Sequence, residues 1–290
     1  MFRSRFPRIG LFAKKNFTRS FSQHMPPLRH DYTQGIAEFM GPGAFQLSWT
    51  NYQQLMVDNL SKATAGKAHL EGQSPKEIAI MCARDPDQAA TFNYASMAFN
   101  NNFFFDGLQP QPVDTPVIQP RLKAAIENSF TSVDSLKMEF VVTASKMFGP
   151  GFVWLVKDRF DQLSMMTTYL AGSPFAGAHY RRQAKDMNTE SFNNKTDYFT
   201  QKLTEPPVNT VGAHGPLSKI RKPPGGIELT PILCVNTWEH VWIADYGMGA
   251  DDVGGKKVFV ENWWRVIDWA GVADHAGLKG NAYSPAKFEQ

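Results

Sequence analysis

Residues 234–247 read CVNTWEHVWIADYG, and this stretch determines how the rest of the sequence is interpreted. Its centre is a Trp-Glu-His triplet whose histidine is His240, and it closes with Asp-Tyr. A carboxylate four residues before the histidine would lie on the same face and complete a pair of metal ligands. That position holds Asn236. The stretch therefore indicates either a metal site with one unusual ligand or a site that no longer binds metal.

The segments before this stretch predict helices. Apolar residues at helical spacing predict one helix over residues 45–64, and Asp85-Pro86 begins a second that ends near residues 106–107. We expect these two helices to pair as an antiparallel hairpin. Four prolines between residues 109 and 120 predict a linker after the hairpin.

Beyond the linker, the sequence predicts two shorter helices, over residues 123–130 and 132–148, with Ser132 as the cap of the second. Near the end of the chain, apolar residues from 259 to 273 predict one final long helix. Between these helices the period changes to two, which is typical of strands, in residues 152–158, 162–168 and 230–236.

These elements predict an α+β fold. An N-terminal α-hairpin domain over residues 26–112 precedes an α/β domain over residues 113–285, which has a small, about three-stranded antiparallel sheet. The chain of 290 residues is long enough for one large domain or two small ones, and 42% hydrophobic residues are sufficient for a packed core. Since no run approaches about 18 consecutive apolar residues, we expect no membrane partner.

Residues 1–21 differ from the rest in composition. They contain six of the 30 basic residues and no acidic one, with phenylalanines interleaved among serines. This composition is typical of a mitochondrial transit peptide, with cleavage after Phe21, although a basic RNA-binding arm has the same composition. Cleavage would leave a net charge of about −3, which excludes a body coated in nucleic acid over its whole surface.

A long insertion separates the second and third predicted strands, over about residues 177–228. Basic side chains outnumber acidic ones in it, and paired prolines stiffen it. Such a segment is either disordered or ordered by a partner. The candidates for contacts with RNA or a partner are Arg181, Arg182, Lys185, Lys219, Arg221 and Lys222.

The order of several short blocks resembles the iron/manganese superoxide dismutase family over residues 26 to about 276. The blocks are PPLRHDY at 26–32, NFFFDGL at 102–108, FGPGFVWLV at 148–156, LAGSPF at 170–175 and NTWEHVWIADY at 236–246. The resemblance implies the α+β fold of that family. It also implies a single iron or manganese ion, held by three histidines and one aspartate, that cycles between oxidation states.

The ligand positions that this resemblance implies are degenerate. Matching the blocks places Ser48, Asn101 and Asn236 where the family has ligands, and keeps only His240. The family's histidine beside the ligands corresponds to Tyr52, and its gateway tyrosine corresponds to Met56. The two positions that can supply its water-orienting glutamine correspond to Met97 and Ala171. We therefore expect no metal, no cofactor and no enzymatic activity.

In the family, the glutamate of the Trp-Glu-His triplet reaches the metal-binding histidine of the other subunit. Glu239 and His240 are both present here, so they are candidates for a hydrogen bond across a dimer interface; the alternative is a pair within the chain. The resemblance also extends to metal-free members that are components of the mitochondrial small ribosomal subunit.

That branch implies a structural protein in the head of the small subunit, located in the mitochondrial matrix and surrounded by ribosomal proteins. Its dimer partner would be a paralogous dismutase-like subunit, and the insertion would make limited contact with rRNA. Two alternatives remain open: a matrix superoxide dismutase and a free-standing matrix adaptor.

Overall fold

The structure is a computed structural model that describes residues 23–83, 85–175, 229–249 and 254–278. The predicted N-terminal region of residues 1–21 and the insertion lie outside these ranges. No helix within the described ranges has both the length and the apolar character needed to span a bilayer.

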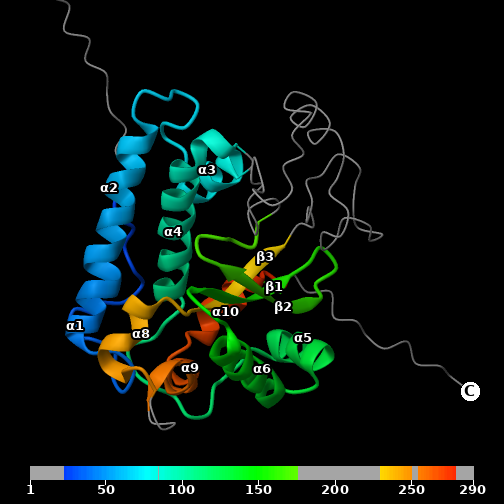
Figure 1. The fold of residues 1–290 in the computed structure, drawn as a ribbon. Helices are drawn as coiled ribbons and strands as arrows, with labels where there is room; N and C mark the ends of the chain where they lie inside the picture. The colour runs from blue at the N-terminus through cyan, green and yellow to red at the C-terminus, as the bar shows by residue number, and fades with distance from the viewer. Residues whose placement is uncertain (1–22, 84, 176–228, 250–253, 279–290) are drawn as a thin grey trace, which may run out of the picture.

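Two long helices form the predicted antiparallel hairpin (Figure 1). The first consists of the short helix α1 (Pro42–Phe45), a π-helical segment (Gln46–Asn51) and α2 (Tyr52–Thr64), which follow one another without a break. The second is α4 (Ala89–Asp106), preceded by a 3₁₀ turn at Pro86–Gln88. The hairpin prediction is thus confirmed, and the π-helical segment is a feature that the apolar spacing did not predict.

A short helix that the sequence analysis missed, α3 (Pro75–Cys82), lies between them and packs on α4. Ser74 caps it in both directions: its hydroxyl accepts from the Glu77 N–H, and the Glu77 carboxylate accepts from the Ser74 N–H. This Ser-x-x-Glu capping box was visible in the sequence and is the signal that would have identified the helix.

The linker leads to α5 (Pro120–Phe130) and α6 (Val133–Lys146). The Ser132 hydroxyl accepts from the Ser135 N–H, which confirms the predicted cap. Three strands follow, β1 (Gly151–Lys157), β2 (Leu163–Tyr169) and β3 (Thr230–Asn236). They form an antiparallel sheet in the order β2-β1-β3, which confirms the predicted sheet.

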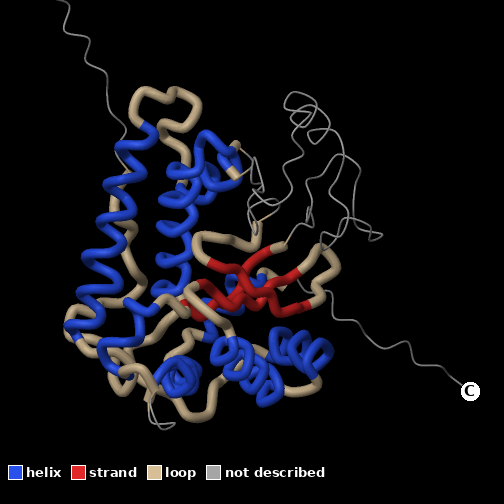
Figure 2. Tube along the Cα trace, viewed as in Figure 1, coloured by secondary structure: helices blue, strands red, loops and turns tan. Residues whose placement is uncertain are grey.

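Helices cover both sides of this sheet (Figure 2). α5 and α6 pack against β2 and β1, while α4 packs against β3. β1 is the central strand, and its residues 151–156 are all buried, including Trp154, whose indole N–H donates to Thr168. The sheet thereby fixes the position of Asn236, the last residue of β3, against the hairpin.

After β3, the described residues up to 278 form three helices: α8 (Glu239–Tyr246), α9 (Gly255–Arg265) and α10 (Trp269–Ala276). The prediction of one long helix over residues 259–273 is therefore wrong. Asp268 caps a new helix, since its carboxylate accepts from the N–H groups of Ala270 and Gly271. The break also bonds to the end of the hairpin, where the Gly107 carbonyl accepts from the Asp268 N–H.

Candidate functional site

Three positions that the sequence analysis assigned to lost metal ligands meet in the core. Ser48 lies in the π-helical segment, Asn101 in α4 and Asn236 at the end of β3, and each is 0% exposed. Asn236 Nδ2 donates to Asn101 Oδ1 at 3.2 Å, and Asn101 Nδ2 donates to the Ser48 carbonyl at 3.1 Å. The hairpin and the sheet are thus joined here by a chain of amide hydrogen bonds, which we call the amide network.

Backbone groups at both ends fix the direction of the amide network. The Trp238 N–H donates to Asn236 Oδ1 at 3.0 Å, so this oxygen must be an acceptor and Nδ2 must point toward Asn101. At the other end the Ser48 carbonyl can only accept. The side-chain amides of Asn101 and Asn236 therefore each have one orientation that is consistent with all of these hydrogen bonds.

Gln53 belongs to the same network, although the sequence analysis did not single it out. Its Oε1 accepts from Asn101 Nδ2 at 3.1 Å, and its Nε2 donates to the Ala98 carbonyl at 2.9 Å. The signal was a polar residue on the apolar face of α2, at helical spacing from Met56, Val57 and Leu60. A buried amide at such a position needs partners for both its ends.

The Ser48 hydroxyl is also satisfied within its own helix. Its Oγ donates to the Ala44 carbonyl at 2.6 Å, one turn earlier. The side chain is therefore directed along the helix and bonded to its backbone.

These groups do not fit iron or manganese. The side-chain oxygen of Asn101 accepts a hydrogen bond from Asn236 Nδ2, and the side-chain oxygen of Asn236 accepts one from the Trp238 N–H. Neutral amides also lack the charge that a carboxylate supplies to a redox-active cation. Within the described residues, no group of three or more His, Cys, Asp or Glu side chains is placed to hold a metal ion.

His240 lies at the start of α8 and packs against aromatic rings. Its ring stacks on Tyr52 with centroids 4.2 Å apart and lies 5.7 Å from the Trp238 ring. Its Nε2 is buried with no hydrogen-bond partner among the described residues. Burial lowers the pKa of His240 to about 4 and raises the pKa of Tyr52 to about 12, so both groups are neutral near pH 7.

Replacing His240 by glutamine should therefore change how stability depends on pH. The folded pKa of about 4 lies below the ordinary histidine pKa of 6.5, so the unfolded chain takes up the proton first as the pH falls. Wild-type stability should be fully present above about pH 6.5 and lose roughly 2–3 kcal/mol from this residue by pH 4. Denaturant unfolding across this range should show a shallower loss for His240→Gln, whereas His69→Gln, an exposed position, should follow the wild type.

The remaining positions of the degenerate site are apolar. Met56, Met97 and Ala171 are buried, at 7%, 3% and 9% exposure, and none can orient a metal-bound water. A second hydrogen-bonded cluster lies next to them: Asn100 Nδ2 donates to the Gly172 carbonyl at 2.9 Å, and the Ser173 hydroxyl donates to Asn100 Oδ1 at 2.6 Å. It fixes the loop after β2 to α4.

The interface candidate Glu239 is exposed. Lys256 interacts with both Glu239 and the segment before Phe148. The negative charge of Glu239 interacts electrostatically with the Lys256 ammonium, which donates a hydrogen bond to the Met147 carbonyl. The next residue, Phe148, is 95% exposed, and Met248, next to the start of α9, is 79% exposed. We call Phe148, Glu239, His240 and Met248 the α8 face.

The predicted candidates for RNA contact all lie outside the described residues: Arg181, Arg182, Lys185, Lys219, Arg221 and Lys222.

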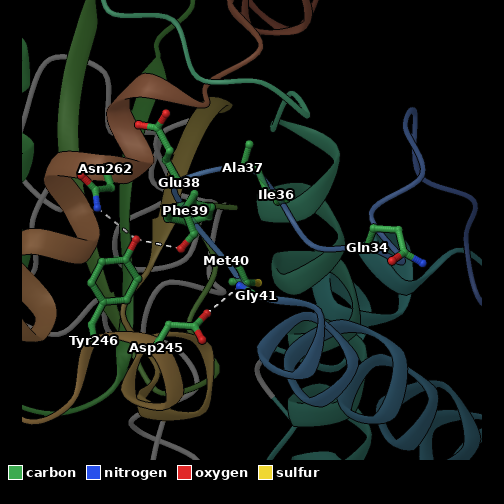
Figure 3. A pocket seen from close by; sticks show the side chains of 10 residues that line it. All are labelled: Gln34, Ile36, Ala37, Glu38, Phe39, Met40, Gly41, Asp245, Tyr246 and Asn262. Carbon is green, nitrogen blue, oxygen red and sulfur yellow. Dashed lines mark hydrogen bonds between the residues drawn. The ribbon is translucent and has the colours of Figure 1, made fainter.

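A groove on the surface lies apart from this site, between residues 34–41 and the helices α8 and α9 (Figure 3). Its polar groups bond to one another: the Tyr246 hydroxyl donates to the Phe39 carbonyl at 2.7 Å, and Asn262 Nδ2 donates to that hydroxyl. The Asp245 carboxylate accepts from the Gly41 N–H at 2.8 Å. The groove therefore fastens the N-terminal segment to the helices and presents few unused polar groups to a ligand.

Comparison with known sequences shows the family of this chain. Residues 118–185 and 216–275 match the family described as "Iron/manganese superoxide dismutases, C-terminal domain". A superoxide dismutase [Fe] of Nostoc sp. is 32% identical over 150 residues, which cover 52% of this chain and 73% of the relative. The chain belongs to the iron/manganese superoxide dismutase family, as the sequence analysis predicted.

Two further relatives are named as ribosomal proteins and not as dismutases. Small ribosomal subunit protein mS43 of Schizosaccharomyces pombe is 26% identical over 243 residues, or 82% of this chain and 79% of the relative. Small ribosomal subunit protein mS42 of the same organism is 28% identical over 199 residues, or 67% of this chain and 70% of the relative. The chain is therefore similar both to dismutases and to proteins of a small ribosomal subunit.

Proposed function

We propose that this chain is a structural component of the mitochondrial small ribosomal subunit, in which the dismutase-like fold serves as a scaffold. It acts in the mitochondrial matrix, in the head of the subunit, and supports mitochondrial translation. The observation that carries this proposal is the amide network, in which Asn101 and Asn236 bond to each other where the family has metal ligands. The similarity to mS43 and mS42 over most of the chain supports it.

The fold would be catalytically inactive. Dismutation needs a metal that changes oxidation state, and the donors that would hold it are replaced by neutral groups that satisfy one another. Met97 and Ala171 hold apolar side chains at the two positions from which the family supplies its water-orienting glutamine, and Met56 replaces the gateway tyrosine. The three changed ligand positions lie in three separate segments of the chain, which supports loss of the whole site and not of one ligand.

Pairing with a paralogous dismutase-like subunit would use the α8 face. Neutral His240 has no acceptor for Nε2 among the described residues, so its proton belongs on Nδ1, where it can be donated to a partner. Glu239 is exposed and offers a carboxylate in return. Phe148 and Met248 supply the apolar area that such an interface needs.

We also propose that residues 1–21 are removed after import, and that the remaining chain consists of a hairpin domain to residue 112 and an α/β domain to about residue 285. The insertion at about residues 177–228 would contact rRNA or a neighbouring protein through its basic side chains.

Fractionation of mitochondrial lysate on a gradient that resolves intact small subunits tests the proposal. The protein should sediment with the small subunit, carry no stoichiometric iron or manganese, and lack residues 1–21 by mass spectrometry. A protein that stays at the top of the gradient would be a matrix adaptor, and one with a full complement of metal would be a dismutase; either result rejects the ribosomal assignment.

A further inference from the structure

The turn between β1 and β2 presents a cation and an aromatic ring together on the surface. The Arg159 guanidinium carbon lies 4.7 Å from the centroid of the Phe160 ring. Phe160 is 58% exposed, and Arg159 is exposed as well. Guanidinium planes and aromatic rings are the two surfaces on which proteins stack unpaired bases.

Hydrogen bonds within the turn make it rigid. Asp158 Oδ1 accepts from the Phe160 N–H at 2.7 Å and from the Gln162 N–H at 3.0 Å. The turn is also tied to α5, because the Leu163 N–H donates to the Ser129 hydroxyl at 3.3 Å. These bonds fix the backbone that carries the two exposed side chains before a partner binds, which lowers the entropy lost on binding.

The charges of the turn leave Arg159 available. Lys157 and Asp161 form an ion pair at 2.8 Å, and the Asp158 carboxylate accepts backbone N–H groups. Arg159 forms no ion pair with any carboxylate in the described part of the chain. Its free guanidinium complements a phosphate, which it can bind through two parallel hydrogen bonds.

The surroundings favour a nucleotide over a protein surface. The turn neighbours of Phe160 are all polar: Asp158, Arg159, Asp161 and Gln162. A protein-binding site usually groups several apolar side chains around its anchor, whereas one ring beside one guanidinium suits a single base and its phosphate.

We propose that the β1–β2 turn binds single-stranded rRNA, with a base stacked on Phe160 and its phosphate held by Arg159. This inference rests on the proposed ribosomal function and assigns the contact to a folded part of the chain. It adds a contact to those proposed for the insertion.

Ultraviolet crosslinking of intact small subunits, followed by mass spectrometry of the protein's peptides, tests this assignment. The peptide that contains Arg159 and Phe160 should carry a crosslinked nucleotide. In subunits that carry Phe160→Ala or Arg159→Gln, the crosslink to this peptide should fall by at least about fivefold, as expected for loss of one stacking or phosphate contact. The control variants Val117→Ala and Arg121→Gln, also at exposed positions, should leave it unchanged.

The possible outcomes separate the two proposals. If the protein sediments with the small subunit but this peptide crosslinks to no RNA, or crosslinks to a neighbouring protein, the turn assignment is wrong and the ribosomal function stands. If the protein does not sediment with the subunit, both are wrong. Thermal unfolding of both variants should match the wild type, because neither side chain is part of the core.

Discussion

Replacing Asn236 by aspartate should destabilise the protein by about 2–4 kcal/mol without creating a metal site. The new carboxylate would be fully buried, and one of its oxygens would face the Asn101 oxygen that now accepts a hydrogen bond at 3.2 Å. Desolvation would raise the folded pKa of this carboxyl above its unfolded value of about 4. The penalty should therefore be small near pH 4 and grow as the pH rises toward 7.

Denaturant unfolding at pH 5 and pH 7.5, together with metal analysis of the purified variant, would measure both effects. Asn128→Asp is a suitable control because Asn128 is exposed on α5, and its stability should stay within about 0.5 kcal/mol of the wild type. Iron or manganese should remain far below one ion per chain, since Ser48 and Asn101 still supply no histidine. Near-full occupancy by either metal would refute our interpretation of the site.

Replacing Phe148 by aspartate should weaken pairing with the partner subunit and leave folding of the isolated protein unchanged. The side chain is 95% exposed, so the isolated protein should unfold at the same temperature as the wild type. In the proposed interface a charge at this position would be desolvated, and we expect pairing to weaken by at least about tenfold, or 1.4 kcal/mol. The variant protein should shift from the small subunit to the top of the gradient, and less of the dismutase-like partner should copurify with it.

Val117→Asp provides the matched control. Val117 is 90% exposed on the linker before α5, so the same change from apolar to acidic is made outside the α8 face. This control should sediment as the wild type does. If Phe148→Asp also sediments normally with its partner, the α8 face is not the pairing surface.

The sequence predicted the family, the fold class and the sheet because long blocks with specific order carry that information. It did not predict α3, whose capping box was overlooked, or the break at Asp268, where apolar spacing continues across two helices. Spacing reports which face is buried, but a helix break depends on a local cap and on the Gly107 carbonyl of a distant segment.

The candidate site was predicted as a set of losses, and the structure shows what the replacing side chains do. Ser48, Asn101 and Asn236 were each identified as non-ligands. The hydrogen bonds that join them directly, and the one from Asn101 to Gln53, depend on how the first hairpin helix, α4 and β3 pack together. The bond between Asn101 and Asn236 joins residues 135 positions apart in the sequence, so no local pattern reveals it. The interface role of Glu239 and His240 and the roles of the insertion stay predictions.

The amide network also bears on how this protein depends on its environment. A fold that is held together by a bound ion gains a stability that depends on the free concentration of that ion, and above the dissociation constant it rises with the logarithm of that concentration. Here the connection between hairpin and sheet consists of side chains bonded to one another and to the backbone at Ser48 and Trp238. We expect the folding equilibrium to be independent of iron and manganese concentration, so that the supply of this subunit follows protein synthesis alone even when either metal is scarce.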